Sequence, residues 1–300
     1  MKPEKNRKIQ ATVDQTTVKM KKSVGERSFQ LCNNIFLILL GLLCLYPLWY
    51  VAMGSISDHQ KVLLYSGPML LPQGLSTEAY QMVSRNPNIL SGYFNTFFIL
   101  IIGVILDMIF TCLGAYVLAQ KNVLWKRPLM LFIMFTMFFS GGLIPSYLNM
   151  KQLHLTGTRW GLIIPFCINT YNMIILRTAF EGLPDSLIEA AKIDGAGHMT
   201  ILSRIVLPLS KATLAVLVLY YGVGIWNGWF WASVLIRERN KLPLQVILRE
   251  VLLAPQGDTE PIAITVRYAT IIVATAPILC IYPFIQKYFT KGVLIGAVKE

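Results

Sequence analysis

The sequence has 300 residues, of which 55% are hydrophobic and only 14% are charged, and its formal net charge is +12. A soluble domain carries roughly a quarter charged residues, so this composition excludes an ordinary soluble globular protein. The basic residues form no domain interleaved with aromatic side chains, which argues against a nucleic acid partner. The composition is that of an integral membrane protein.

The apolar residues fall in six long blocks, each of 19 residues or more. A helix rises ~1.5 Å per residue, so each block is long enough to cross a hydrocarbon core about 30 Å thick. The strands of a membrane barrel would show alternating segments of about ten residues, and the sequence has no such pattern. We therefore predict an all-α polytopic membrane protein with six transmembrane helices. The predicted spans are 35–53, 94–119, 128–148, 160–178, 212–236 and 269–289.

A basic segment, residues 1–28, precedes the first span, and the short loop 120–127 adds three more basic residues. Basic residues concentrate on the cytoplasmic side of membrane proteins, so we expect cytoplasmic N- and C-termini in a bacterial plasma membrane. The first apolar run is longer than the core of a signal peptide and is expected to remain as a helix. The basic tail is expected either to be solvated or to contact anionic membrane lipid.

Two long connections, 54–93 and 237–267, are expected on the outer side of the membrane. The first contains LSTEAYQMVSRNP and the second KLPLQVILREVLLAP, and each predicts a short surface helix. These helices either cover the bundle or form a docking surface for an extracytoplasmic partner.

The longest inner connection, 179–211, contains EAAKIDGAG at residues 189–197. Pro184 and Asp185 suit the first turn of a helix, and Gly195 can take the left-handed conformation that ends one. The predicted helix has small residues, Ala190 and Ala191, at its centre, whereas a helix on a lipid surface carries large apolar side chains there. Small residues allow another protein surface to approach closely. This stretch therefore predicts a protein-binding helix on the cytoplasmic side.

Residues 189–208, EAAKIDGAGHMTILSRIVLP, match the pattern EAA, three residues, G, nine residues, I-x-L-P. This pattern resembles the signature of the membrane subunits of binding-protein-dependent ABC importers, and nearly the whole chain past residue 30 is similar to them. In that family the stretch is a coupling helix seated in a cleft of the ATP-binding subunit. By this resemblance, the residues expected to couple to the ATP-binding subunit are Glu189, Ala190, Ala191, Asp194, Gly195, Leu207 and Pro208.

Three further stretches are similar to the maltose-type carbohydrate permeases. They are WNGWFWA at 226–232, the ending GAVK at 296–299, and FFSGGLIPSY at 138–147, which is similar to the subgroup for complex oligosaccharides. The resemblance implies the type I transmembrane domain of ABC importers, with a permease domain at 29–289, a coupling helix near 185–197 and a cytoplasmic tail at 290–300. The implied partners are a second permease subunit, two ATP-binding subunits and an extracytoplasmic sugar-binding protein.

The sequence contains no phosphate-binding G-x-x-x-x-G-K-[ST] loop, and its three histidines are scattered. We therefore expect no catalytic residue, no metal site and no cofactor in this chain. ATP and its magnesium would be bound by the partner subunits.

Amides and aromatic rings inside the spans are candidates for a sugar path. Asn side chains offer donors and acceptors to sugar hydroxyls, and aromatic rings can stack on sugar faces. The same residues could instead serve helix packing or an interfacial aromatic belt. The candidate path residues are Asn169, Tyr171 and Asn172 in the fourth span and Trp226, Asn227 and Trp229 at the outer end of the fifth.

Asp107 lies midway along the second span and is either a path residue or a structural acid paired with Arg177. The sequence thus predicts an ABC importer permease for carbohydrate, with oligosaccharide as the expected cargo. An importer of amino acids, peptides or phosphonates shares the coupling pattern and is the first alternative. A secondary transporter with Asp107 as its ion site and a membrane scaffold without transport are the others.

Overall fold

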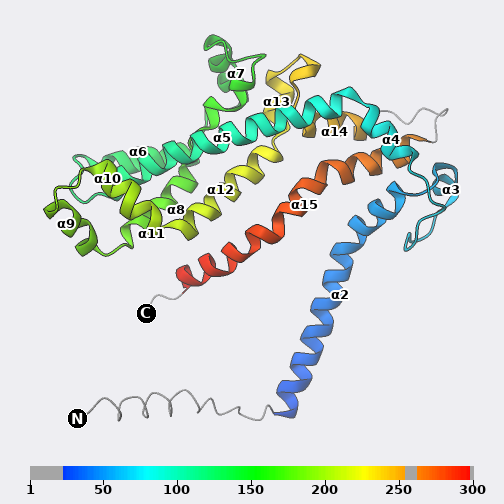
Figure 1. The fold of residues 1–300 in the computed structure, drawn as a ribbon, viewed down its shortest axis with the longest axis horizontal. Coiled ribbons are helices and arrows are strands. Elements are labelled where there is room, and N and C mark those ends of the chain that lie inside the picture. The colour runs from blue at the N-terminus through cyan, green and yellow to red at the C-terminus, as the bar shows by residue number, and fades with distance from the viewer. Residues whose placement is uncertain (1–22, 254–261, 298–300) are drawn as a thin grey trace. The chain divides into compact units, whose positions relative to one another are not determined.

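The structure is a computed structural model that describes residues 23–253 and 262–297 of the chain (Figure 1). The chain divides into two units, residues 1–50 and 51–300. In its described part the first unit is the helix α2 (Val24–Ser55), whose last turns belong to the second unit. The predicted basic tail 1–28 is therefore helical from Val24 on, and residues 1–22 lie outside the described residues. At 32 residues, α2 is long and apolar enough to cross a membrane.

Helix α5 (Pro87–Ala119) organises the second unit (Figure 1). The Oδ1 atom of Asn86 accepts a hydrogen bond from the backbone N–H of Asn88 at 3.0 Å, and Pro87 occupies the first turn, where its missing N–H costs nothing. Along its length α5 packs against α8 (Thr170–Glu181), α12 (Lys211–Trp226) and α14 (Leu244–Leu253).

Three glycines allow these helices to approach α5 closely. Gly92, Gly103 and Gly114 recur every eleven residues, about three helical turns, so they lie along one face. A Cβ atom added there would lie 2.5 Å from a side chain of α14, 2.9 Å from one of α12 and 2.7 Å from one of α8 respectively. Glycine is therefore required at these positions by the packing.

Three of the predicted spans are not single straight helices. The predicted span 128–148 is α6 (Lys126–Phe138) followed by α7 (Leu143–Gln152), bent by 111°. Gly142, at the break, has φ of 84°, a conformation that directs the chain out of the helix. The predicted span 160–178 consists of the 3₁₀ turns η1 (Arg159–Leu162) and η2 (Ile164–Phe166) and then α8, bent by 45°.

The fifth predicted span, 212–236, ends as a helix at Trp226, where α12 gives way to a loop and the short helix α13 (Phe230–Leu235). On its other side α12 meets the preceding helical segment at a bend of 86°. By length and composition, the described residues contain three continuous helices able to cross a membrane, or up to six spans if each bent pair counts as one. The prediction of an all-helical membrane protein is confirmed, with broken helices in place of three straight ones.

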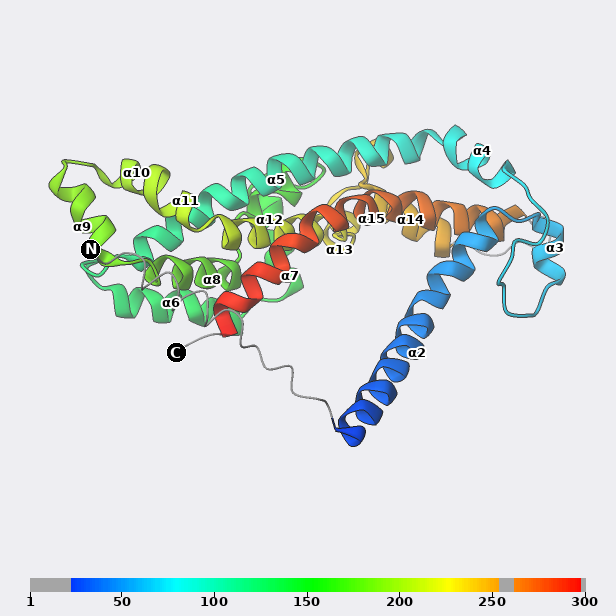
Figure 2. The same ribbon diagram turned by 60° about the horizontal axis from the view of Figure 1, so that its bottom comes forward.

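The two ends of α5 carry different elements (Figure 2). Near Ala119 lie α9 (Asp185–Ile193), α10 (His198–Ile201), the π-helical turn η3 (Leu202–Val206) and α11 (Leu207–Leu209), and we call this the α9 end. Near Pro87 lie α4 (Glu78–Arg85) and α14, and we call this the α14 end. The helices α4 and α14 are the two surface helices predicted in the long connections. The remaining short elements are α3 (His59–Leu64) and η4 (Arg239–Lys241).

A buried amide joins three segments near the α14 end. Asn95 is fully buried, and its Nδ2 atom donates to the backbone oxygens of Asn240 at 2.8 Å and Leu242 at 3.0 Å. Its Oδ1 atom accepts from the Nε–H of Arg159 at 2.8 Å. Because Asn95 is fully buried, these three hydrogen bonds satisfy its amide group and fix α5 to the segments before α14 and after α7.

The last helix, α15 (Ile262–Ala297), contains the sixth predicted span and packs against α4, α12 and α14. The predicted tail 290–300 is therefore a continuation of this helix as far as Ala297, and residues 298–300 lie outside the described residues. The hydrophobic core has one large cluster near the α14 end, around Trp226 and Ile247, and another near the α9 end, around Leu176 and Leu217.

Candidate functional site

The predicted coupling helix is present as α9, and its end has a well-defined cap. The N–H of Ala196 donates to the oxygen of Ala191 at 2.9 Å, and the N–H of Gly195 donates to that of Lys192 at 3.1 Å. Gly195 has φ of 80°, so the left-handed glycine that the sequence predicted is confirmed. The two hydrogen bonds and the glycine form a Schellman motif, which satisfies carbonyls that the helix end leaves open.

Helix α9 presents most of its surface outward. Ala191 is its buried residue, whereas Glu189 and Ala190 are exposed. Asp194 and Gly195, just past its end, are exposed as well. The apolar Ile193 is 86% exposed and Met199 is 67% exposed, which is unusual for such side chains next to a structured core. This surface is suited to contact with another protein.

Ion pairs attach α9 and the end of α8 to the loop that follows α5. The Nζ atom of Lys121 lies 2.5 Å from the Oδ2 atom of Asp185, the first residue of α9. The hydrogen bond to Asp185 and its negative charge raise the pKa of Lys121. Both side chains are largely exposed, so the pair orients α9 and contributes little to stability. A second pair joins Lys126 to Glu181 at 3.1 Å.

The remaining positions of the coupling pattern lie beyond α9, in α11. Leu207 and Pro208 belong to α11, where Leu207 is half-buried against the core cluster of the α9 end and Pro208 is exposed. Ile201 and Val206 are each 1% exposed, so the chain between α9 and α12 is firmly anchored. A displacement of α9 would therefore be transmitted to α12.

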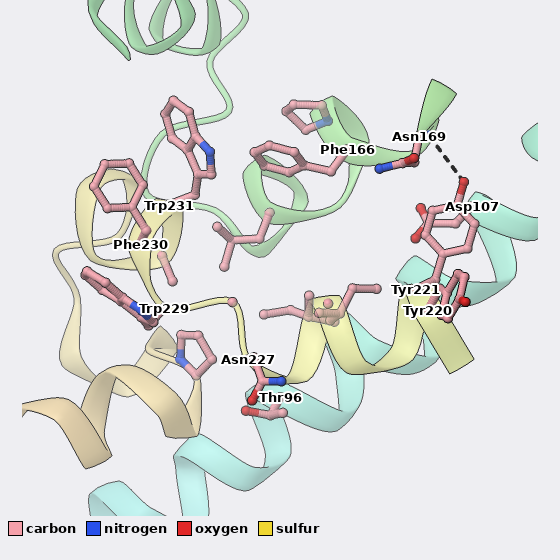
Figure 3. A pocket seen from close by; sticks show the side chains of 18 of the residues that line it. Thr96, Asp107, Phe166, Asn169, Tyr220, Tyr221, Asn227, Trp229, Phe230 and Trp231 are labelled. Carbon is pink, nitrogen blue, oxygen red and sulfur yellow. Dashed lines mark hydrogen bonds between the residues drawn. The ribbon is translucent and has the colours of Figure 1, made fainter. Parts of the chain in front are cut away.

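A cavity of about 420 Å³ lies between α5, the broken span that ends in α8, the end of α12 and the loop before α13 (Figure 3). Its walls combine aromatic rings with amide and hydroxyl groups. The polar and aromatic lining residues are Thr96, Asp107, Phe166, Asn169, Asn172, Tyr220, Tyr221, Asn227, Trp229, Phe230 and Trp231.

The aromatic wall comes from the stretch WNGWFWA together with Phe166. The rings of Phe166 and Trp231 have centroids 5.8 Å apart, and Phe230 lies 5.7 Å from both Trp229 and Trp231. The guanidinium of Arg249 in α14 lies 4.0 Å from the centroid of Trp229. Contacts of this kind hold large rings in place, and they leave ring surface facing the cavity (Figure 3).

The polar wall lies at the other end of the cavity, where the fourth span is broken. The Oδ1 atom of Asn169 accepts from the N–H of Asn172 at 3.1 Å, so Asn169 caps the start of α8. The backbone N–H of Asn169 donates to the Tyr221 hydroxyl at 3.2 Å, drawn as a dashed line in Figure 3. That hydroxyl also lies 2.6 Å from Oγ1 of Thr111. The broken backbone thus faces a polar cavity, a placement that membrane proteins tolerate only where no lipid is met.

Four of the six predicted path residues line this cavity, namely Asn169, Asn172, Asn227 and Trp229. The other two do not. Tyr171 is 55% exposed and is absent from the lining, and Trp226 is 3% exposed and packs against Phe97 with ring centroids 5.7 Å apart.

Several lining residues were not among those predicted from the sequence, namely Thr96, Phe166, Tyr220, Tyr221, Phe230 and Trp231. The high density of aromatic residues at 226–232 could have indicated Phe230 and Trp231. Phe166 and the two tyrosines carried no such signal, because single aromatic residues in apolar spans are common.

The proposed pairing of Asp107 with Arg177 is wrong. The Nη2 atom of Arg177 lies 2.8 Å from Glu181 one helical turn away, and Asp107 lines the cavity. Residues 23–253 and 262–297 contain no group of three or more His, Cys, Asp or Glu side chains placed to hold a metal ion.

The bent spans, the exposed helix α9 and the cavity are features of a membrane transport subunit, and comparison with known proteins gives its family. The profile of the binding-protein-dependent transport system inner membrane component matches residues 113–295, and the chain belongs to this family. It is an inner-membrane, multi-pass permease component of an ABC importer, is not itself catalytic, and is of a family that carries no cofactor.

Individual relatives extend the match over most of the chain. Protein LplC of Bacillus subtilis (strain 168) is 40% identical over 91% of this chain and 95% of the relative. The polygalacturonan/rhamnogalacturonan transport system permease protein YtcP of the same organism is 37% identical over 91% of this chain and 99% of the relative. The crystal structure of a bacterial ABC transporter involved in the import of the acidic polysaccharide alginate has a chain with 35% identity and a TM-score of 0.85, covering 90% of this chain and 99% of that one.

Proposed function

We propose that this chain is the permease subunit of an ABC importer for carbohydrate, with oligosaccharides as its cargo. The observation that carries the proposal is the cavity, in which aromatic rings at one end face amides and hydroxyls at the other. Sugar rings have apolar faces that stack on aromatic side chains and hydroxyls that pair with amides. The relatives named for polygalacturonan and alginate transport support the same class of cargo.

The proposed mechanism is alternating access driven by partner subunits. An ATP-binding subunit would hold α9 through Glu189, Ala190 and Asp194, which the helix exposes. Closure of two such subunits around ATP would move α9, and the buried segment from α10 to α11 would pass the movement to α12. Because the far end of α12 lines the cavity, the same movement would change the side on which the cavity opens.

The described residues offer up to six spans, so a second permease subunit would be needed to enclose a path. An extracytoplasmic sugar-binding protein would deliver the cargo to the α14 end. This arrangement places both termini in the cytoplasm. A cysteine at position 300 that reacts with a membrane-impermeant thiol reagent in intact cells would contradict this orientation.

Transport by the reconstituted complex tests the proposal. The permease, its partner subunits and its binding protein would be placed in vesicles loaded with ATP and exposed to a mixture of polysaccharide hydrolysates. Mass spectrometry of the vesicle contents would identify what enters. Uptake of oligosaccharide only in the presence of ATP is expected. Uptake that continues without ATP and stops with an uncoupler would indicate ion-coupled transport instead.

Variants of the lining test the path. Trp229→Ala and Asn172→Leu are expected to lower kcat/KM for uptake at least about tenfold, the effect of losing ~1.4 kcal/mol of interaction. Tyr171→Ala is a matched control, because this aromatic residue lies on α8 but outside the lining. If Trp229→Ala and Asn172→Leu take up oligosaccharide as fast as the Tyr171→Ala control and the wild type, the cargo does not pass along these residues.

A further inference from the structure

The cavity contains one formally charged side chain among the described lining residues, Asp107. It comes from α5 and is 3% exposed. Figure 3 shows it at the polar end of the cavity, beside Asn169 and Tyr221 and away from Trp229. A carboxylate in this position is enclosed by protein on most sides and open to the cavity.

The carboxylate has no hydrogen-bond or ion-pair partner among residues 23–253 and 264–281, whose side chains the structure describes. Two groups that could have served it have other partners. The hydroxyl of Tyr221 is bonded to Thr111 and to the N–H of Asn169, and Arg177 is bonded to Glu181. A buried carboxylate without donors is costly, so an unpartnered one that faces a cavity indicates a ligand that supplies donors.

The start of α8 does not supply these donors. The Oδ1 atom of Asn169 accepts one of the free N–H groups at the start of the helix, that of Asn172. The positive end of the α8 dipole makes a nearby negative charge more favourable, but it leaves the lone pairs of the carboxylate unused.

We propose that Asp107 is a substrate-binding residue that accepts hydrogen bonds from the hydroxyl groups of a neutral sugar unit, and that its charge disfavours a uronate unit at the same position. Two adjacent hydroxyls of a pyranose can donate to the two oxygens of one carboxylate, and such charge-assisted bonds are strong. A uronate would bring a second negative charge into a lining that contains no cationic side chain among the described residues. The inference rests on the proposed function and specifies the chemistry of its cargo, and the neutral preference would distinguish this chain from the relatives named for the acidic polymers polygalacturonan and alginate.

The test uses one sugar backbone in two charge states. Oligogalacturonides and the same oligosaccharides after reduction of their carboxyl groups differ only in the charge at C6. Uptake of each would be measured in vesicles containing the whole complex with Asp107, Asp107→Asn or Asp107→Leu. Glu26→Gln in the first turn of α2, an exposed residue, is the control for loss of an acid outside the cavity.

The wild-type complex is expected to take up the neutral form faster than the charged form. Asp107→Asn should lower uptake of the neutral form at least about tenfold, because an amide oxygen accepts weaker hydrogen bonds than a carboxylate, and should narrow or reverse the preference between the two forms. Asp107→Leu should lower uptake of the neutral form further, and Glu26→Gln should change neither value. Basal ATP hydrolysis should stay unchanged in Glu26→Gln, and recovery of the intact complex should stay unchanged in all variants.

Three results would overturn the inference. Unchanged uptake and unchanged preference in both Asp107 variants would show that the carboxylate does not meet the cargo. Loss of complex recovery in parallel with uptake would show that Asp107 pairs with a partner subunit. A wild-type complex that imports no carbohydrate from either series or from the hydrolysate mixture would refute the proposed function itself, and this inference with it.

Discussion

Gly195 gives the sharpest test of the coupling helix, because the structure separates backbone strain from steric crowding there. Its φ is 80°, and a Cβ atom added to it would meet no described atom within 4 Å. Gly195→Ala therefore introduces strain and little else. A left-handed conformation costs an L-residue about 1–2 kcal/mol. This cost lowers the ratio of the native cap to conformations in which residue 195 is not left-handed by roughly 5- to 30-fold.

Gly197 is the matched control. It lies two residues further on, has an ordinary φ of −74°, and an added Cβ atom would again meet no described atom within 4 Å. Substrate-stimulated ATP hydrolysis and uptake would be measured for both alanine variants in the reconstituted complex. We expect Gly195→Ala to reduce stimulation and uptake severalfold and Gly197→Ala to leave them unchanged. Gly195→Asn should be milder than Gly195→Ala, because asparagine tolerates the left-handed region better.

Equal coupling in Gly195→Ala and Gly197→Ala would refute the reasoning. It would mean that the Schellman cap of α9 is not needed for contact with the ATP-binding subunit. A fall in the amount of folded permease, measured by size-exclusion chromatography in detergent, would instead indicate that the strain is felt beyond α9. We do not expect this, because most of the core cluster at the α9 end is formed by other elements and Gly195 itself is exposed.

Three further predictions concern the scaffold. Asn95→Leu should lower the free energy of unfolding by about 2–4 kcal/mol, because it leaves two backbone carbonyls and a guanidinium without their partner, and thermal unfolding in detergent would measure the loss. Gly92→Ala should lower the melting temperature, since the new Cβ atom would lie 2.5 Å from a side chain of α14, whereas Gly222→Ala, with its nearest atom at 3.9 Å, should not. Lys121→Ala should leave uptake within about twofold of wild type, because its ion pair with Asp185 is exposed; a larger loss would give this pair a role in coupling.

The family of the protein could be predicted from sequence because its evidence is local. The coupling helix depends on Pro184, Asp185 and Gly195, residues whose backbone preferences act within one or two turns. The apolar blocks likewise predict membrane spans, since crossing a bilayer requires a certain length of apolar helix whatever its neighbours are.

The breaks in the spans could not be predicted in the same way. A straight apolar helix and one that is interrupted at Gly142 or near Asn169 can have the same hydropathy, so hydropathy alone does not distinguish them. Asn169 and Asn172 both line the cavity, but Asn169 caps the start of α8 and does not lie within a continuous span. A broken span is stable only where neighbouring elements satisfy its free backbone groups, as the Tyr221 hydroxyl does for Asn169.

The sequence by itself therefore determined the class of protein, the position and end of α9, and the kinds of side chain available to a sugar. Only the tertiary structure decided which of them meet, because adjacent residues can face opposite environments. Trp226 is turned into the core and Trp229 toward the cavity, although they are only three positions apart, because the helix ends between the two. Asp107 is the clearest case, because whether a buried acid is paired or faces a cavity depends on where distant residues such as Arg177 and Tyr221 find their own partners.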